Sequence, residues 1–321
     1  MSNSDFSNLT PDLILGAIES QGMVVESGLL TLNSYENRVY QFIAEDKKRY
    51  VAKFYRPLRW SQTQIQEEHD FSTELASHNI PVVAPLIQNK QSLHIYKDYL
   101  FTIFPSVGGR QFEVDNINQI ESIGYSIGQI HGVANSANFA HRPTLNVSEY
   151  LMVPLQELQK SALIPSYLQQ TFFSVLQQVI DLTLSLYFST NNIRLHGDCH
   201  PGNILWCDGP TFVDLDDCRS GPAIQDLWML LSGDKQQQCI QLRALIRAYE
   251  TCCDFDANQL ALIEPLRAMR MVHYMAWLTK RWQDPAFPQA FPWFADPKYW
   301  EQQILVLKEQ FYALQEPPVT L

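Results

Sequence analysis

Residues 195–206 read LHGDCHPGNILW. Two histidines, an aspartate and a cysteine fall within 196–200, and an asparagine follows at position 203. A set of this kind could begin a metal cage, form a redox site or make up a catalytic loop. Which of the three it is decides both the fold and the function.

The metal-cage and redox interpretations lack partners elsewhere in the sequence. A zinc site usually needs four nitrogen or sulfur ligands in two spaced pairs. His196, Cys199 and His200 could start such a site, but no matching His or Cys cluster exists elsewhere, and Pro201-Gly202 turns the chain away. Cys199 also lacks a partner thiol at redox spacing. Both interpretations are disfavoured.

The third interpretation uses Asp198 and Asn203. The spacing D-x-x-x-x-N occurs in the kinase catalytic loop, where the Asp accepts the proton of the substrate hydroxyl and the Asn holds magnesium. Phosphoryl transfer needs an aligned hydroxyl and hard oxygen ligands for a metal that bridges the phosphates. One tight loop with this spacing can supply a base and a ligand, although the spacing alone is weakly specific.

The surrounding sequence favours the kinase interpretation. Residues 204–206 and 211–217 predict a hairpin whose second strand ends at Asp214, 11 residues after Asn203. Lys53 lies in the strand-like run VAKFY, comparable to the strand whose lysine holds phosphates in kinases. Glu68, with Glu67 as the alternative, falls on the inward face of the next predicted helix. A lone Lys in a strand or a lone Glu on a helix would ordinarily be solvated surface. A strand Lys, a helix Glu, D-x-x-x-x-N and a strand-end Asp in this order are hard to obtain by chance.

The predicted elements change in type along the chain. Thr10-Pro11 begins a helix to about Ser20, 38–44 and 49–55 alternate as a hairpin, and Ser61 with Gln64 forms a capping box for a helix to about His78. Strands are expected near 93–97 and at 99–105. Helices are expected at 116–134, 150–160, 165–188, 222–232, 235–252, 257–282 and 297–315.

We therefore expect an α+β chain with a bilobal arrangement. Residues 1–105 would form a small β-rich N-terminal lobe that binds nucleotide. Residues 106–110, SVGGR, would form the hinge, and residues 111–321 a larger, mostly helical lobe that holds the catalytic and substrate-binding residues. A cleft between two such lobes is a common ligand site.

Composition excludes several classes of function. The 321 residues carry a net charge of −11, which argues against binding nucleic acid or an anionic membrane. The N-terminal sequence has no basic, apolar leader, and the charge-free run 161–180 contains several Gln and a Pro, so we expect neither export nor a membrane span. The six cysteines are expected to be free thiols. We expect a cytoplasmic monomer.

The ordered set resembles the aminoglycoside-phosphotransferase and choline-kinase-like branch of the protein-kinase-like fold, where H-G-D replaces H-R-D. Within that branch the chain resembles a subgroup of Ser/Thr protein kinases of the bacterial stress response. The resemblance covers nearly the whole chain and rests on NSYENRVYQF (33–42), KFYRP (53–57), FPSVGGRQFE (104–113), HGDCHPGNILW (196–206), FVDLDD (212–217), QDLWMLL (225–231), EPLRAMR (264–270) and DPAFP (284–288).

The resemblance implies an ATP- and magnesium-dependent phosphotransferase that phosphorylates protein Ser or Thr and also itself. Asp198 and Asp214 would be the catalytic residues, with Asp198 as proton acceptor. Asn203 and Asp214 would hold the magnesium. The protein substrates cannot be named from these residues.

The resemblance also implies the nucleotide-binding residues. Lys53 would contact phosphate, and Glu68 would orient the side chain of Lys53. Ser34, in the turn before the first hairpin strand, would lie near the phosphates. The backbone around Phe104 and Ser106 would meet the adenine.

Two features depart from ordinary protein kinases. There is no G-x-G-x-x-G, so Asn33 and Ser34 must cover the phosphates, and DLDD stands in place of D-F-G. The helical run GPAIQDLWMLL follows Asp214 within about ten residues, a spacing that leaves no room for a long activation loop.

Several residues near the loop keep two interpretations. His196 is expected to brace the loop, His200 could face the cleft, and Asp226 is expected to bind the backbone N–H groups of 196–198. Asp216 is either a third metal ligand or a solvated or backbone-bonding residue. Trp293 and Trp300 are core or loop anchors, or else line an acceptor groove.

Two other functions compete with a protein kinase. The first is a small-molecule kinase of the same fold that acts on an amino alcohol, a sugar or homoserine. The second is a catalytically dead nucleotide-binding module, which the presence of Lys53, Asp198, Asn203 and Asp214 disfavours.

Overall fold

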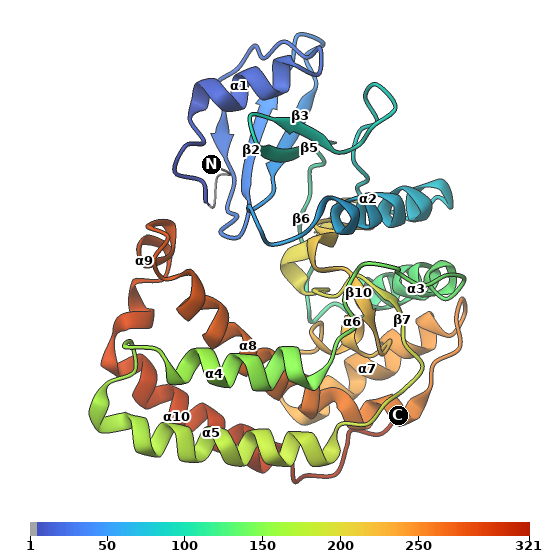
Figure 1. Ribbon diagram of the computed structural model, residues 1–321. Helices are drawn as coiled ribbons and strands as arrows, with labels where there is room; N and C mark the ends of the chain where they lie inside the picture. The colour runs from blue at the N-terminus through green and yellow to red at the C-terminus, as the bar shows by residue number, and fades with distance from the viewer. Residues whose placement is uncertain (1–4) are drawn as a thin grey trace.

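The computed structural model describes residues 5–321 and has two lobes (Figure 1). The N-terminal lobe is a five-stranded antiparallel sheet with the order β1-β2-β3-β5-β4. Its strands are β1 (Leu30–Thr31), β2 (Arg38–Ile43), β3 (Arg49–Phe54), β4 (His94–Tyr96) and β5 (Tyr99–Pro105). The rest of the chain is mostly helical, so the predicted α+β, protein-kinase-like fold class is confirmed.

Two helices accompany the sheet, and both begin where the sequence predicts. In α1 (Pro11–Glu19), the side chain of Thr10 accepts a hydrogen bond from the backbone N–H of Leu13. In α2 (Gln62–Ser77), Ser61 and Gln64 form both halves of the capping box. These side chains satisfy backbone N–H groups that the first helical turn cannot satisfy itself.

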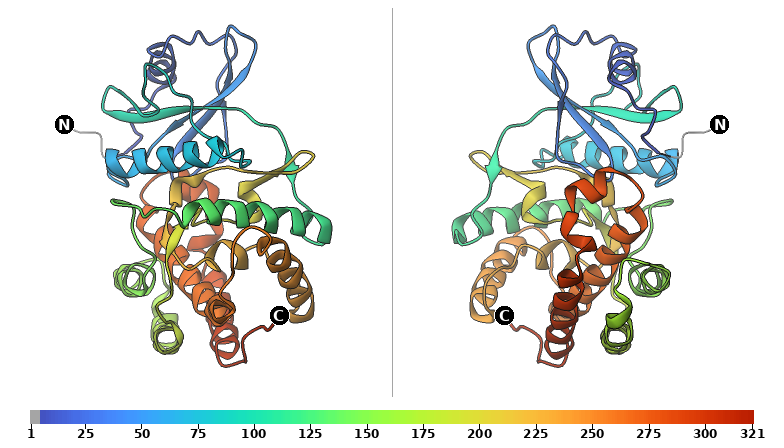
Figure 2. Two further views of the ribbon diagram at one scale, coloured as in Figure 1. Left: turned by 90° about the vertical axis from the view of Figure 1, so that its right-hand side faces the viewer. Right: turned by 90° about the vertical axis from the view of Figure 1, so that its left-hand side faces the viewer.

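The two helices belong to different hydrophobic cores. Ile14 and Ile18 of α1 pack with Phe42, Phe54 and other sheet residues in a core confined to the N-terminal lobe. Phe71 and Leu75 of α2 belong instead to the large core of the helical lobe. The second helix therefore lies between the sheet and the C-terminal lobe, as Figure 2 shows, and it couples the position of Glu68 to both.

The C-terminal lobe contains eight α-helices within the described residues. They are α3 (Ile117–Ala134), α4 (Val153–Gln159), α5 (Ser166–Leu186), α6 (Gln225–Trp228), α7 (Lys235–Tyr249), α8 (Ile263–Arg281), α9 (Ala286–Ala290) and α10 (Pro297–Ala313). Two small sheets support the catalytic segment: β10 (Arg219–Gly221) pairs with β7 (Ile193–Leu195), and β8 (Ile204–Trp206) pairs with both β6 (Arg110–Gln111) and β9 (Pro210–Phe212).

Two glycines let α3 approach α7 closely. A Cβ at Gly124 would lie 2.3 Å from the carbonyl oxygen of Leu245, and one at Gly128 would lie 2.5 Å from that of Tyr249. No side chain fits at either position. The close contact holds α3 against α7 and brings His131 of α3 beside the catalytic segment.

The chain enters the C-terminal lobe at the end of the predicted hinge. Arg110 and Gln111 already pair with β8 of that lobe, so the connecting segment between the lobes spans 106–109. The boundaries 1–105, 106–110 and 111–321 remain our proposal, and residues 1–4 lie outside the described part. No helix within residues 5–321 is both long enough and apolar enough to cross a bilayer.

Two predicted elements next to the catalytic loop differ from the structure. The second strand of the 204–217 hairpin ends at Phe212, not at Asp214, because Asp214 takes a left-handed conformation with φ of 60° and begins a 3-10 turn, Leu215–Asp217. The predicted helix at 222–232 has a single α-helical turn. The N–H groups of Leu230 and Leu231 donate to carbonyl oxygens only three residues back, those of Leu227 and Trp228, as in a 3-10 helix. The short elements β1, β6, β7, β10 and α9 were not predicted.

Candidate active site

The loop 196–203 leaves β7 and returns to β8 through the 3-10 turn Pro201–Asn203. Gly197 has a left-handed φ of 86°, and a Cβ there would lie 2.1 Å from the carbonyl oxygen of Asp217. Only glycine fits both the conformation and the space. This close approach brings the loop beside the DLDD segment, 214–217.

Asp226 holds the backbone of the loop. Its carboxylate accepts hydrogen bonds from the backbone N–H groups of His196, at 2.7 Å, and Gly197, at 2.9 Å. His131 Nε2 lies 3.2 Å from the same carboxylate, and His131 Nδ1 lies 3.0 Å from the hydroxyl of Tyr249. The structural role predicted for Asp226 is confirmed, while His131 and Tyr249 were missed.

The side chain of His196 ties the same end of the loop to the segment before Asp214. Its Nε2 lies 2.9 Å from the carbonyl oxygen of Val213, directly before Asp214. His200 accepts a hydrogen bond from the N–H of Gly202 at its Nδ1. Burial raises the pKa of the Cys199 thiol well above its usual range. Among residues 5–321 no group of three or more His, Cys, Asp or Glu side chains could hold a metal. This finding and the contacts of the two histidines argue against a zinc cage.

Asp198 lies between two basic side chains. One carboxylate oxygen pairs with Arg270 of α8, and the other lies 3.4 Å from His200 Nε2. Burial opposes its ionisation, but the hydrogen bond from His200 and the charge of Arg270 outweigh burial and hold the Asp198 pKa below its usual value. Asp198 is therefore a carboxylate at neutral pH and can accept a hydrogen bond from a hydroxyl.

Asn203 is fixed to the same loop. Its side-chain Nδ2 donates a hydrogen bond to the carbonyl oxygen of Asp198 at 3.0 Å. With the amide nitrogen used in this way, the amide oxygen is the atom that Asn203 can offer to a cation.

Lys53 is buried at the centre of a cluster of carboxylates. Its Nζ lies 2.9 Å from Asp214, 3.2 Å from Asp216 and 3.5 Å from Glu68. Burial opposes the charge, but these three carboxylates outweigh it and hold the Lys53 pKa well above its usual value. The strand lysine, the helix glutamate and the DLDD segment thus meet in space although they are far apart in sequence.

Glu68 and Glu67 have different partners. Glu68 is buried, and its second oxygen lies 2.9 Å from Arg142 Nη2. The Glu67 carboxylate instead accepts the backbone N–H groups of residues 140–142 at 2.6 to 2.8 Å. Glu68, not Glu67, is the residue that contacts Lys53.

Asp216 is 3% exposed and ion-paired with Lys53 and Arg59, so it is not a solvated residue. It lines the same cavity as Asp198 and Asp214, and its role as a third metal ligand stays a prediction. Trp300 is fully buried and belongs to the core, which rules out an acceptor-groove role. Trp293 is partly exposed and packs against Tyr299 at a ring-centroid distance of 4.9 Å.

One cavity of about 460 Å³ joins the residues of the catalytic segment with the turn before β2. Asp198, Asn203 and Asp214 line it from the C-terminal lobe, and Asn33 and Ser34 line it from the N-terminal lobe. The structure therefore brings the predicted phosphate-covering turn to the predicted metal-binding residues.

Phe104 and Ser106 lie outside the lining of this cavity. The Phe104 ring lies edge-on to His69 at 6.4 Å, so its side chain faces α2. The Ser106 N–H donates to the carbonyl oxygen of Arg49 at 3.0 Å, and its hydroxyl accepts from Gln41. That N–H is already used within the lobe, and an adenine contact in this segment must use other backbone groups.

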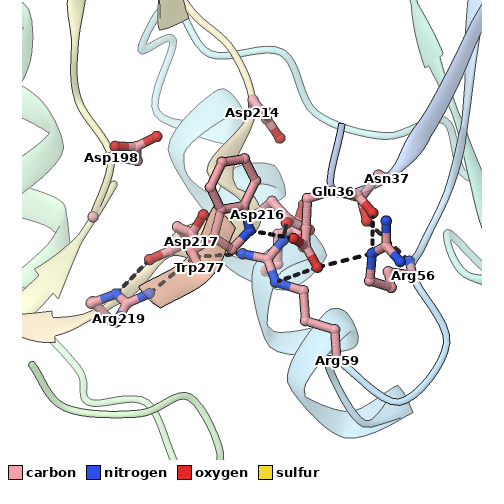
Figure 3. Close-up of polar contacts among 12 residues, drawn as sticks. Glu36, Asn37, Arg56, Arg59, Asp198, Asp214, Asp216, Asp217, Arg219 and Trp277 are labelled. Carbon is pink, nitrogen blue, oxygen red and sulfur yellow. Dashed lines mark hydrogen bonds and ion pairs between the residues drawn. The ribbon is translucent and has the colours of Figure 1, made fainter. Parts of the chain in front are cut away.

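A polar cluster that the sequence did not predict ties the turn before β2 to the end of α8. Figure 3 shows three of its residues, Glu36, Arg56 and Trp277. Glu36 accepts from Arg281 at 2.6 Å and from the indole N–H of Trp277, and it lies 3.1 Å from Arg56. Arg56 also lies 2.8 Å from Asp284. We call these five residues, Glu36, Arg56, Trp277, Arg281 and Asp284, the inter-lobe latch.

The oxygen atoms in the cavity suit magnesium. Asn203 offers an amide oxygen, and Asp214, whose side chain is about half exposed, offers a carboxylate. Magnesium is usually bound through one or two carboxylates together with substrate phosphates and water, and not by a full protein cage. The two residues fit that pattern.

Comparison with known proteins identifies relatives over the full chain. The sequence pattern described as phosphotransferase enzyme family matches residues 29–263. Serine/threonine protein kinase RdoA of Salmonella typhimurium is 52% identical over 319 residues, which is 98% of this chain and 97% of the relative. Stress response kinase A of Escherichia coli strain K12 is 51% identical over 324 residues, which is 100% of this chain and 99% of the relative.

A solved structure shares the fold at low sequence identity. The amicoumacin kinase hAmiN, solved in complex with AMP-PNP, Ca²⁺ and Ami, superposes with a TM-score of 0.66 at 19% identity, covering 91% of this chain and 89% of that one. The kinase activity predicted from the sequence is confirmed at the level of the family. The chain belongs to the phosphotransferase enzyme family.

Proposed function

We propose that this chain is an ATP- and magnesium-dependent Ser/Thr protein kinase that also phosphorylates itself and acts in a bacterial stress response. The observation that carries the proposal is the meeting of Lys53, Glu68 and Asp214 in one cluster beside a cavity that Asp198 and Asn203 also line. The names of the two relatives at 51–52% identity support the protein acceptor and the stress response.

In this proposal the chain's own residues perform three tasks. Lys53, held by Glu68, neutralises phosphate oxygens of ATP. Asn203 and Asp214 would hold magnesium, whose charge would offset that of the ATP phosphates. Asp198 accepts a hydrogen bond from the acceptor hydroxyl and aligns it with the terminal phosphate.

The low pKa of Asp198 fits orientation better than strong basicity. A carboxylate that stays ionised is a weak proton acceptor until the hydroxyl acquires positive character during transfer. The contribution of Asp198 is therefore chiefly to alignment, with proton acceptance late in the reaction.

The alternative is a small-molecule kinase, and the solved amicoumacin kinase shows that the fold supports that chemistry. A cationic acceptor would need a carboxylate that is free to bind it. In this cavity Glu36, Asp216 and Asp217 are each ion-paired with arginine. This pairing argues against a cationic acceptor such as an amino alcohol.

The test is incubation of the purified chain with labelled ATP and magnesium, in the presence of a generic protein acceptor and, separately, of amino alcohols, sugars and homoserine. The proposal predicts label on the chain itself and on the protein acceptor. Label only on a small molecule would support the alternative, and no label would support a dead nucleotide-binding module. We also expect a cytoplasmic monomer with no affinity for nucleic acid. Sedimentation checks the oligomeric state, and filter binding checks the affinity for nucleic acid.

A further inference from the structure

Arg270 lines the cavity beside Asp198, the proposed proton acceptor, and its side chain is exposed. It lies on α8, its side chain is 42% exposed, and it lines the same cavity as Asp198. Among the described residues its ion-pair partner is Asp198, through Nη1. The guanidinium has five N–H donors in a planar fork, and one contact to Asp198 leaves most of them unused.

The second arginine of the cavity is already committed. Arg59 pairs with Asp216 and with Asp217, at 2.8 Å for the latter, and it lies 3.8 Å from Glu36. In Figure 3 it is enclosed by Glu36 on one side and the two aspartates on the other. Two carboxylates therefore already balance the charge of Arg59.

The carboxylates around the acceptor side are committed as well. Asp217 lies 3.0 Å from Arg219 in addition to Arg59, and Glu36 is held by Arg281 and Trp277. Asp214 is held by Lys53. A cationic acceptor would have to break one of these pairs, whereas an anionic group would find the exposed donors of Arg270.

We propose that Arg270 selects an acceptor hydroxyl that carries an anionic group next to it, in peptide form a serine or threonine with an adjacent aspartate or glutamate. This inference rests on the proposed function and names its substrate class. Because Arg270 already contacts Asp198, a hydroxyl placed on Asp198 lies within a few ångströms of the guanidinium. The anionic group must then be close to the hydroxyl, and a carboxylate can bind the planar fork with two N–H groups.

Local contact, not long-range attraction, must supply this preference. The net charge of −11 repels an acidic peptide at a distance. Raising the ionic strength screens that repulsion more than it screens the partly buried contact at Arg270.

The experiment compares two peptides with one serine each, identical except for glutamate or lysine directly after the serine. For the wild-type chain, kcat/KM is expected to be at least about tenfold higher for the glutamate peptide, mainly through a lower KM, as a charged hydrogen bond would give. Arg270→Glu is expected to reverse the order of the two peptides, and Arg270→Lys to retain a reduced preference for glutamate. The ratio between peptides is the readout, so a general loss of rate does not affect it.

The matched control is Arg243→Glu, which makes the same change of net charge at an exposed position of α7 outside the cavity. It is expected to keep the wild-type ratio. Equal rates for both peptides, or an unchanged preference for glutamate in Arg270→Glu, would overturn the inference and leave the proposed function standing. Transfer to neither peptide, together with transfer to a small molecule, would overturn the proposed function and this inference with it.

Discussion

At the scale of single residues, the catalytic loop depends on side chains that perform no chemistry. Asp226 binds two backbone N–H groups of the loop. His131 in turn holds Asp226, and the hydroxyl of Tyr249 holds His131. Buried backbone donors left without an acceptor are costly. These buried side chains thus fix the backbone conformation of the residues around Asp198.

We expect Asp226→Ala to lower the free energy of unfolding by about 3–5 kcal/mol, as removal of one partner from a buried charged network does. The physical reason is that the N–H groups of His196 and Gly197 lose their acceptor. Urea denaturation measures the effect. Asp254→Ala, at an exposed position, is the control and should change stability little; similar values for both variants would contradict the assigned role.

A buried histidine gives the chain a pH dependence. His69 lies 2.8 Å from the hydroxyl of Tyr55 and 2.9 Å from that of Ser92. Burial, followed by the charges of Lys53 and Arg142, lowers the pKa of His69 to about 3. The folded state keeps it neutral while the unfolded chain protonates it below about pH 6.5. Its contribution to stability is complete above that pH and is lost as the pH falls from about 6.5 toward 3.

The measurement is the free energy of unfolding at several pH values between about 7.5 and 5, for the wild type and for His69→Gln. Below about pH 6.5 the wild type should lose up to about 1.4 kcal/mol per pH unit more than the variant. His78→Gln, exposed at the end of the same helix, should keep the wild-type slope. Parallel curves for the wild type and His69→Gln would refute the assignment.

Residue types and spacings indicated Lys53, Glu68, Asp198, Asn203 and Asp214, because each sits in a short pattern whose chemistry can be recognised locally. Other residues of the site have no such local pattern. Arg270 lies 72 positions from Asp198, Tyr249 lies 118 from His131, and Arg281 lies 245 from Glu36. Only the folded chain brings these partners together.

At the scale of elements, capping chemistry predicted the beginnings of α1 and α2 well, because the side chain and the N–H group that it binds are three residues apart. The segment at 222–232 could not be predicted in the same way. Its apolar residues are buried in the core, and burial alone does not distinguish an α-helix from successive tight turns. The left-handed conformation of Asp214 likewise depends on neighbours outside the local sequence.

The inter-lobe latch gives the turn before β2 a specific anchor. Residues 33–37 line the cavity, and Glu36 in that turn is bound to the end of α8. A turn with no G-x-G-x-x-G has no glycine-rich backbone to wrap the phosphates, so side-chain anchoring can take over the task of holding it closed. We therefore expect the latch to affect nucleotide affinity more than the rate of transfer.

We expect Arg281→Gln to weaken ATP–magnesium binding about threefold to tenfold, a value below that of a fully buried charged hydrogen bond because the pair is partly exposed. Isothermal titration measures the dissociation constant. Lys280→Gln, the exposed neighbour on α8, removes the same charge outside the latch. Equal affinities for the two variants would show that the latch does not hold the turn.

At the scale of the whole molecule, the two lobes have separate cores joined through α2, the latch and the segment 106–109. Proton acceptor and metal ligands come from the C-terminal lobe, and Lys53 comes from the N-terminal lobe. We assign Asp198 to the hydroxyl and Asp214 to the metal, although both residues line one cavity. The two carboxylates must therefore respond differently to substitution.

The most direct test titrates Asp198→Asn, Asp214→Asn and Asn203→Ala with ATP, with and without magnesium, beside a single-turnover transfer assay. Asp198→Asn should keep nucleotide affinity within a few-fold while transfer falls by about 10²–10⁴, the usual contribution of a positioned general base. Asp214→Asn and Asn203→Ala should weaken magnesium-dependent nucleotide binding as well as transfer. Loss of nucleotide binding in Asp198→Asn with normal binding in Asp214→Asn, or full transfer in all three variants, would contradict the account.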